Sequence, residues 1–272
     1  MIVFPNCKIN LGLTITRKRE DGYHDLETVF YPIALKDALE VIQQPDANAS
    51  TTFTQSGITV EGQPGNNLCL KAYHLLKRDF PQLPGIQMHL HKVIPMGAGL
   101  GGGSSDAAFT LKLLNQKFNL GLSVKQLIDY GLQLGSDCPF FIINQPCFAT
   151  GRGEFLQKIK LDLSAYHIVL VNPGIHVNTG WAFTQLIPQA PQKSVETIIQ
   201  QPIESWKNEL INDFEKPVFE KYPEIKAIKD KLYDAGAVYA SMSGSGSTVY
   251  GLFTTNPVLN NSFLAHYFVK QL

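Results

Sequence analysis

Residues 94–108 organise the rest of this chain, and they read Ile94-Pro95-Met96-Gly97-Ala98-Gly99-Leu100-Gly101-Gly102-Gly103-Ser104-Ser105-Asp106-Ala107-Ala108. Five glycines fall within seven residues, and two serines and a helical pattern follow them. Glycine lets a ligand approach the main chain closely, and the first turn of a helix presents unpaired N–H groups with a positive potential. The stretch therefore predicts a phosphate-binding loop.

The surroundings of this loop favour phosphate binding over a flexible surface turn, which is the alternative for any Gly-Ser-rich stretch. The alternating segment 86–93 predicts a strand that leads into the loop, and Ser104 or Ser105 can cap the helix that leaves it. No lysine follows the glycines, so the stretch is not a P-loop. It contains G-x-G but lacks the full βαβ context, with its acidic residue, of a dinucleotide fingerprint.

The composition indicates one soluble globular protein of 272 residues, with 44% apolar residues and a formal net charge of zero. This balance argues against a general nucleic-acid or membrane binder. No apolar run approaches the ~20 residues that span a bilayer. The four cysteines lack a metal-binding spacing, so we expect buried free thiols in a reducing compartment and a cytoplasmic location.

The order of predicted elements indicates an α+β protein with two lobes joined near residue 150, that is, domains over 1–150 and 151–272. The elements we expect are a β-rich segment over 1–43, a helix over 68–80 capped by Asn66 or Asn67, a helix from Ser123 to Gly135, a strand over 140–143, a strand over 168–171, a surface connection over 187–202, helices over about 204–217 and 223–235, and strands over 238–242 and 248–253.

A second glycine turn, Ser243-Gly244-Ser245-Gly246-Ser247, lies between two of the predicted strands. Taken alone, it most simply predicts a tight hairpin. The functional alternative is a second wall, at which the backbone approaches the same phosphates or substrate as the loop at 94–108.

Several polar side chains stand in apolar or aromatic surroundings. Asp137 follows Gly135-Ser136 and is either a turn residue or a general base for a hydroxyl proton. Lys8 is either an edge-strand lysine or an inward ammonium that stabilises developing charge, and Asn10 would share its face of the strand. Tyr23 and His24 are either ordinary loop residues or a recognition element for a flat heteroaromatic base.

Together these stretches resemble the GHMP kinase superfamily, named for galactokinase, homoserine kinase, mevalonate kinase and phosphomevalonate kinase. The resemblance is carried by residues 95–105 and by the late turn at 243–247. It implies a two-lobed fold with a glycine-rich phosphate loop in the N-terminal lobe, an α/β C-terminal lobe, and an active site in the cleft between them.

Three further features point to one branch of that superfamily: Lys8-Ile9-Asn10-Leu11, Asp21-Gly22-Tyr23-His24-Asp25-Leu26 and the segment Leu134–Phe141. They resemble a kinase of the non-mevalonate isoprenoid route that transfers the γ-phosphoryl group of ATP to a tertiary hydroxyl of a cytidyl-containing alcohol. The alternatives are another small-molecule GHMP kinase, such as a homoserine or mevalonate kinase, and a catalytically silent nucleotide-binding regulator.

The resemblance also implies roles for individual residues. Asp137 is the base and Lys8 orients the hydroxyl. The residues implied for the cytidyl substrate are Asn10, Tyr23, His24, Thr179 and Phe183, with the cytosine held between Tyr23 and Phe183. The residues implied for ATP are Asn67, Lys92, Pro95, Met96, Gly97, Ala98, Gly99, Leu100, Gly101, Gly102, Gly103, Ser104 and Ser105.

Mg²⁺ is expected with ATP, with a serine of the 104–105 pair as its candidate protein ligand. We expect a monomer or a weak homodimer. Asp106 departs from what a phosphate site favours, because its charge follows the serine pair directly, and its role is open at this point.

Overall fold

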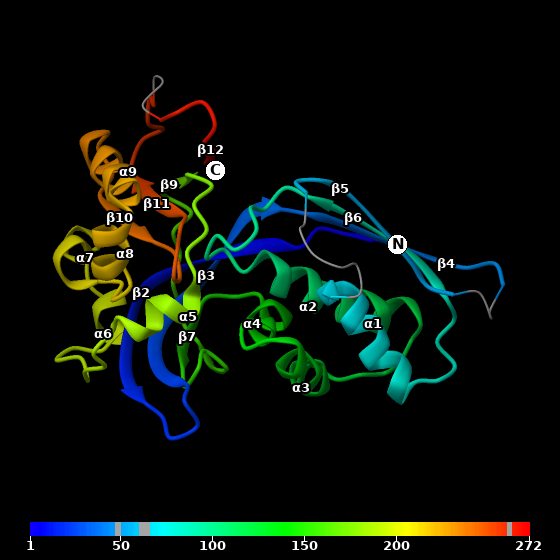
Figure 1. The fold of residues 1–272 in the computed structure, drawn as a ribbon. Helices are drawn as coiled ribbons and strands as arrows, with labels where there is room; N and C mark the ends of the chain where they lie inside the picture. Colours follow the sequence, from blue (N-terminus) through cyan, green and yellow to red (C-terminus); the bar gives the residue numbers. More distant parts are fainter. Residues whose placement is uncertain (47–49, 60–65, 260–262) are drawn as a thin grey trace. The chain divides into compact units, whose positions relative to one another are not determined.

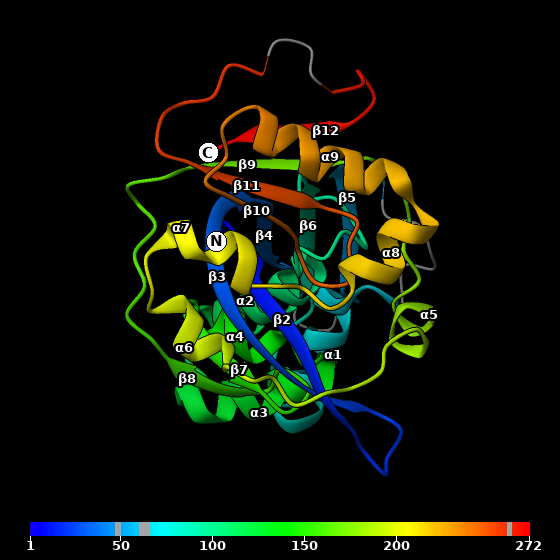
Figure 2. The ribbon, with the colours of Figure 1, turned by 90° about the vertical axis from the view of Figure 1, so that its left-hand side faces the viewer.

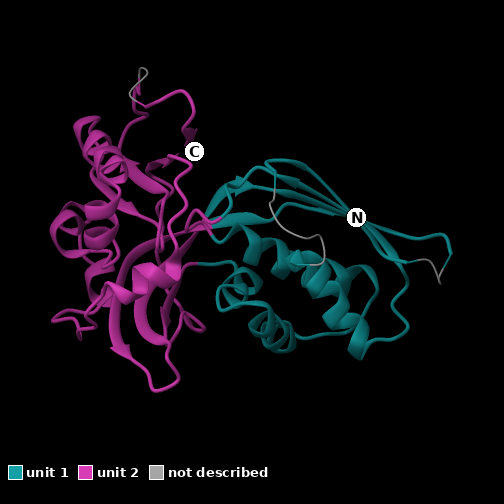
Figure 3. Cartoon of the chain, in the orientation of Figure 1, with its two compact units in different colours: residues 1–7, 33–96, 101–145 teal, residues 8–32, 97–100, 146–272 magenta. Residues whose placement is uncertain are grey.

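The computed structural model describes residues 1–46, 50–59, 66–259 and 263–272. Its contacts divide the chain into two compact units, shown in Figure 3. Unit 1 comprises residues 1–7, 33–96 and 101–145, and unit 2 comprises residues 8–32, 97–100 and 146–272. One division falls between residues 145 and 146, near the expected junction at residue 150. Residues 8–32 and 97–100, however, belong to unit 2 and not to the N-terminal unit.

Among its described residues, unit 1 combines one sheet with four helices, which Figure 1 labels. Its sheet has the order β1-β4-β6-β5, and only β5 and β6 pair in parallel among its neighbours. The strands are β1 (Ile2–Val3), β4 (Ala38–Gln43), β5 (Thr52–Gly57) and β6 (Ile86–Lys92), and the helices are α1 (Leu68–Asp79), α2 (Gly102–Lys117), α3 (Val124–Leu134) and α4 (Cys138–Ile143).

The helix starts predicted by capping residues are confirmed in α1 and α3. The Asn67 side chain accepts a hydrogen bond from the Cys69 backbone N–H, which satisfies one of the unpaired donors of the first turn. Ser123 and Gln126 form a reciprocal capping box at α3, and Gly135 is the C-cap.

Two predictions for unit 1 are wrong. Residues 140–143 belong to helix α4 and not to a strand, because a short apolar run fits either element and Pro139 favours a helix start. Helix α2 begins at Gly102 with Gly101 as its N-cap, so Ser104 and Ser105 lie inside the first turns and do not cap the helix. Gly101 adopts a φ of 70°, a conformation that serine rarely reaches.

Two further sheets lie mainly in unit 2 among the described residues, with the orders β2-β3-β7-β8 and β10-β11-β9-β12. The first two residues of β2 and the last four of β3 belong to unit 1. The strands are β2 (Asn6–Lys18), β3 (His24–Lys36), β7 (Cys147–Thr150), β8 (Phe155–Lys158), β9 (His167–Asn172), β10 (Tyr239–Met242), β11 (Val249–Phe253) and β12 (Phe268–Gln271). The helices are α5 (Thr179–Thr184), α6 (Val195–Ile199), α7 (Ile203–Glu209), α8 (Glu215–Lys221) and α9 (Pro223–Asp234).

The core of unit 2 lies where α9 covers β10 and β11 (Figure 2). Ile225, Ile228 and Leu232 follow the helical period and are buried against Val249 and other residues of the sheet. The β-rich start of the chain and the strands expected over 168–171, 238–242 and 248–253 are confirmed within a residue or two.

The chain between residues 187 and 217 differs from the prediction. The expected surface connection contains helix α6, whose Val195, Ile198 and Ile199 are buried. The single helix expected over 204–217 is two helices, α7 and α8. Between them the chain runs beside β2, where Leu13 donates its backbone N–H to the Ile211 carbonyl and accepts from Asp213. Pairing with β2 satisfies these backbone groups without a helix.

Candidate active site

The glycine loop alternates between ordinary and left-handed backbone. Gly97, Gly99 and Gly101 have φ values of 57°, 76° and 70°, and α2 begins immediately afterwards. In its first turns Ser104 is half-buried and Ser105 is fully buried. A loop of this kind, which ends at a helix N-terminus, presents backbone N–H groups to an anion.

The second glycine turn packs against this loop within unit 2. Ser243 donates its hydroxyl to the Gly99 carbonyl at 2.8 Å, and the Thr248 backbone N–H donates to the Ala98 carbonyl at 3.2 Å. A Cβ at Gly99 would overlap the Ser243 carbonyl. The turn is thus both the connection between the antiparallel strands β10 and β11 and a wall against the first glycine loop.

Lys8 points into the protein, and its side chain is buried. Its ammonium donates to Asn10 Oδ1 at 2.5 Å and to the Gly99 carbonyl at 2.9 Å, so the lysine reaches the glycine loop. Asn10 in turn donates from Nδ2 to Thr28 Oγ1 at 3.0 Å. The prediction that Lys8 and Asn10 share one face of a strand is confirmed. Strand β2 does lie at the edge of its sheet, but the alternative in which Lys8 points to water is wrong.

Asp137 occupies the N-cap position of α4 in unit 1 and is half-buried. Its side chain makes no capping hydrogen bond, although the position would allow one. The residue lies in the turn before α4, and its role as the general base stays a prediction.

Two of the residues implied for cytosine recognition, His24 and Phe183, meet within unit 2. The rings of His24 and Phe183 are stacked, with centroids 4.9 Å apart and planes at 19°. Tyr23 stands 56% exposed on the turn between β2 and β3. Burial, helped by the positive charge of Lys18, lowers the pKa of His24, so the imidazole stays neutral at physiological pH and offers both a donor and an acceptor.

Helix α5 positions the other two predicted substrate residues. Thr179 and Phe183 stand four residues apart, which places them on one face of the helix. The Thr179 hydroxyl lies 2.8 Å from the Ser245 hydroxyl, so the face of α5 reaches the second glycine turn.

Two residues with suitable chemistry were missed by the sequence analysis. The Arg152 guanidinium lies 4.9 Å from the centre of the Tyr23 ring and so covers one face of it. A Cβ at Gly97 would lie 3.3 Å from His176 Nδ1, so this exposed imidazole stands beside the glycine loop. An arginine between two glycines, Gly151 and Gly153, was the available signal for the first; nothing in the local sequence marks His176.

On the predicted ATP side, two residues already have partners in unit 1. The side-chain amide oxygen of Asn67 caps α1, as described above. The Lys92 ammonium lies between the carboxylates of Asp37 and Asp106 and is buried. Asp106 therefore does not point at a phosphate. The roles of Asn67 and Lys92 in binding ATP remain predictions.

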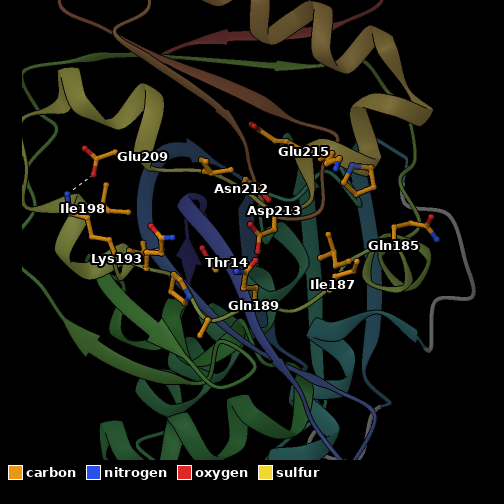
Figure 4. A pocket seen from close by; sticks show the side chains of 18 of the residues that line it. Thr14, Gln185, Ile187, Gln189, Lys193, Ile198, Glu209, Asn212, Asp213 and Glu215 are labelled. Carbon is orange, nitrogen blue, oxygen red and sulfur yellow. Dashed lines mark hydrogen bonds and ion pairs between the residues drawn. The ribbon is translucent and has the colours of Figure 1, made fainter.

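A pocket of about 1200 Å³ lies in unit 2 (Figure 4). It is lined by Thr14 of β2, the 185–193 segment, and residues of α6, α7 and α8, with an ion pair between Lys193 and Glu209 at one side. None of the predicted site residues lines it. The arrangement of functional groups, and not the size of this pocket, identifies the candidate site.

The described residues near the glycine loop supply single oxygen ligands and not a complete metal site. Among the residues that the structure describes, no three His, Cys, Asp or Glu side chains gather as a metal site. Mg²⁺ accepts one or two protein oxygens beside phosphate and water, and the half-buried Ser104 hydroxyl in the first turns of α2 suits that need. Ser105 is fully buried and Asp106 is paired with Lys92, so these two do not.

All four cysteines are free and buried, as predicted. Burial raises the pKa of the Cys138 thiol to about 12 and that of Cys147 to about 11, which leaves both thiols protonated and unreactive. Within the described ranges of the chain, no helix has both the length and the apolar character needed to cross a bilayer.

Comparison with known proteins identifies the class. Residues 67–151 match the GHMP kinases N terminal domain, and residues 195–260 match the GHMP kinases C terminal domain. A mevalonate kinase from Methanococcus jannaschii superimposes with a TM-score of 0.72 over 100% of this chain and 97% of that one, at 14% identity, which shows the fold alone. The chain belongs to the GHMP kinases, which are ATP-dependent small-molecule kinases.

Several relatives belong to a narrower group within this family. A 4-diphosphocytidyl-2-C-methyl-D-erythritol kinase from Bacteroides fragilis is 55% identical over 93% of this chain and 92% of its own length. A kinase of the same name from Azobacteroides pseudotrichonymphae is 52% identical over 99% of this chain and 100% of its own length. A crystal structure of the same kinase superimposes with a TM-score of 0.79 at 33% identity, covering 93% of this chain and 90% of that chain. The chain belongs with these kinases, and the predicted fold class, activity and branch are confirmed.

Proposed function

We propose that the residues described above carry out the reaction of this branch, in which the γ-phosphoryl group of ATP passes to the 2-hydroxyl of 4-diphosphocytidyl-2-C-methyl-D-erythritol. The products are the 2-phosphate and ADP. The observation that supports this most directly is the side chain of Lys8, a buried ammonium that donates both to Asn10 and to the glycine loop.

In this proposal Asp137 accepts the proton of the 2-hydroxyl while that oxygen forms a bond to the γ-phosphorus and the bond to the ADP oxygen breaks. Lys8 stabilises the negative charge that develops on the transferring group and on the attacking oxygen. Asn10 acts through Lys8, because its amide oxygen and nitrogen are already used by Lys8 and Thr28.

The glycine loop and the first turn of α2 hold the phosphates of ATP through backbone N–H groups, with Asn67 near the nucleoside. Mg²⁺, when bound, neutralises phosphate charge, and Ser104 is its proposed protein ligand. At the other end, Tyr23 and Phe183 take the cytosine between them, His24 hydrogen-bonds its edge, and Thr179 lines the same end. Arg152 supports the outer face of Tyr23.

The free, buried thiols support a reducing, cytoplasmic location for the enzyme. Its expected partners are the small-molecule substrates. A monomer or weak homodimer remains the expected state in solution.

The test is Asp137→Asn. The amide is nearly isosteric but accepts no proton, so we expect turnover to fall about 10²- to 10⁴-fold while the dissociation constant of an unreactive ATP analogue changes less than about threefold. Asp129→Asn, the same change at an exposed carboxylate of α3, is the matched control and should behave as wild type. Near-normal turnover of Asp137→Asn would remove Asp137 from the role of base.

The substrate assignment is tested by ADP release with a panel of alcohols. The cytidyl compound should be phosphorylated, whereas homoserine and mevalonate, which lack a nucleobase, should not be. Phosphorylation of mevalonate or homoserine in preference to the cytidyl compound would favour another GHMP kinase activity, and no ADP release with any of them would favour a silent nucleotide binder.

A further inference from the structure

A buried triad of charges in unit 1 lies next to the two ends of the glycine loop, at residues 93–94 and Gly102. Lys92 ends strand β6, and its side chain is 1% exposed. Its ammonium contacts Asp37 Oδ2 at 2.5 Å and Asp106 Oδ2 at 2.8 Å, and the two carboxylate side chains are 0% and 4% exposed. Burying three charges is unfavourable unless each is closely paired, so the arrangement constrains the position of every member.

Asp37 joins this triad to the start of the loop. Its second oxygen, Oδ1, accepts the backbone N–H groups of Val93 at 2.6 Å and of Ile94 at 2.9 Å. These residues connect β6 to Pro95 and the first loop glycine. Asp37 itself is held by its backbone N–H, which donates to the Pro5 carbonyl at 2.8 Å. One carboxylate therefore links the Lys92 ammonium to the chain that enters the loop.

Lys92 joins the triad to the end of the loop. A Cβ at Gly102, the first residue of α2, would lie 3.3 Å from Lys92 Nζ. The ammonium is thus packed directly beneath the turn where the loop becomes a helix. Asp106, in the second turn of the same helix, holds the ammonium from the other side.

We propose that Lys92 and Asp37 are positioning residues for ATP, which fix the two ends of the phosphate loop relative to each other. Lys92 acts through its packing beneath Gly102 and its pairing with Asp37 and Asp106, and not through a contact of its ammonium with the nucleotide. The inference rests on the proposed assignment of the loop to the ATP phosphates. Backbone N–H groups bind phosphate well only when they are held in the bound arrangement beforehand.

The two aspartates provide a matched pair of variants. Asp37→Asn and Asp106→Asn each remove one negative charge from the same ammonium. In Asp37→Asn only one of the two side-chain oxygens remains as an acceptor, and an NH₂ group replaces the other. Either the Lys92 ammonium or the N–H groups of residues 93–94 would then face another donor. In Asp106→Asn the amide oxygen can face Lys92, and the amide nitrogen takes the place of Oδ1, which has no hydrogen-bond partner in the described part of the chain.

The measurement is the dissociation constant of an unreactive ATP analogue by calorimetry. We expect Asp37→Asn to raise it at least tenfold and Asp106→Asn to raise it less than threefold, with the affinity for the cytidyl substrate within about threefold of wild type in both. Asp37→Glu keeps the charge but moves the acceptor by one methylene, and it should also raise the dissociation constant if Asp37→Asn does not fold.

A purely structural role would lower the thermal midpoint of both aspartate variants and leave the nucleotide affinity of the folded protein unchanged, which would overturn the inference. Equal losses of affinity in the two variants would also overturn it. Lys229→Met, which removes the partner of the buried Glu215 in unit 2, controls for loss of a buried ion pair elsewhere. If Gly99→Ala also leaves nucleotide affinity unchanged, the assignment of the loop to ATP fails; if it weakens binding and Asp37→Asn does not, only the present inference fails.

Discussion

Lys8 illustrates how one residue gains its role from its surroundings. A lysine in an apolar strand usually turns its ammonium to water. Here the ammonium stays inside because it donates hydrogen bonds to Asn10 Oδ1 and to the Gly99 carbonyl oxygen. The Asn10 side chain is anchored by Thr28, whose hydroxyl donates to the Gly12 carbonyl. This chain of hydrogen bonds restricts the ammonium to one position beside the glycine loop.

At the same scale, Tyr23→Ala tests the recognition of the base. Stacking of a nucleobase on an aromatic ring contributes about 1–3 kcal/mol, so the KM for the cytidyl substrate should rise about 5- to 150-fold. The KM for ATP should change less than about twofold. Tyr23→Phe keeps the ring face and should lie within about threefold of wild type. Equal losses for both substrates in steady-state kinetics would contradict the assignment of this residue.

Among the elements, helix α4 shows where local sequence is ambiguous. Phe140 and Phe141 belong to an apolar run too short to distinguish a buried strand from a buried helix by its period. The helix contacts both the neighbouring α3 and the more distant α2, and its apolar residues are buried. Its N-cap is Asp137, so this tertiary packing also decides where the predicted base stands.

The glycine loop makes a prediction at the same scale. Gly99→Ala would introduce a Cβ that overlaps the Ser243 carbonyl, at a residue whose φ is 76°. The loop must shift, so the affinity for an unreactive ATP analogue should fall at least tenfold, and the free energy of unfolding should fall by more than the about 1–2 kcal/mol that a left-handed residue costs.

Gly174→Ala is the matched control for this substitution. Gly174 has a similar φ of 77°, but no atom lies within reach of an added Cβ. In a denaturant titration, its free energy of unfolding should fall only by the about 1–2 kcal/mol that a left-handed residue costs. Its nucleotide affinity should be that of wild type. An equal loss of affinity in the two variants would show that close approach of the second glycine turn does not matter.

For the whole molecule, the burial of the cysteines predicts a chemical behaviour. Cys7, Cys69 and Cys138 lie in unit 1 and Cys147 in unit 2, and all are buried. Burial raises the thiol pKa of Cys69, Cys138 and Cys147, which suppresses the reactive thiolate.

We therefore expect no reaction with an aromatic disulfide reagent in the native protein at pH 8 within an hour, and four equivalents after unfolding in guanidinium. The absorbance of the released thiolate is the measurement, and the unfolded protein is the control. Rapid labelling of the native protein would contradict the burial of these side chains.

Much of this protein can be read from local patterns. The glycine loop, the capping residues Asn67 and Ser123, and the strands around them follow from backbone preference and hydrogen bonding within a few residues. The resemblance in residues 95–105 and in the segments around Lys8 and Tyr23 correctly predicted the family and its branch.

Other features depend on contacts between segments far apart in the chain. The second glycine turn meets the first across 144 residues, and Lys92 meets Asp37 across 55. The 211–213 segment leaves helical conformation because β2 offers its backbone partners. Local sequence does not indicate these partners. A charge is buried, or a backbone group paired, only when folding brings the distant segments together.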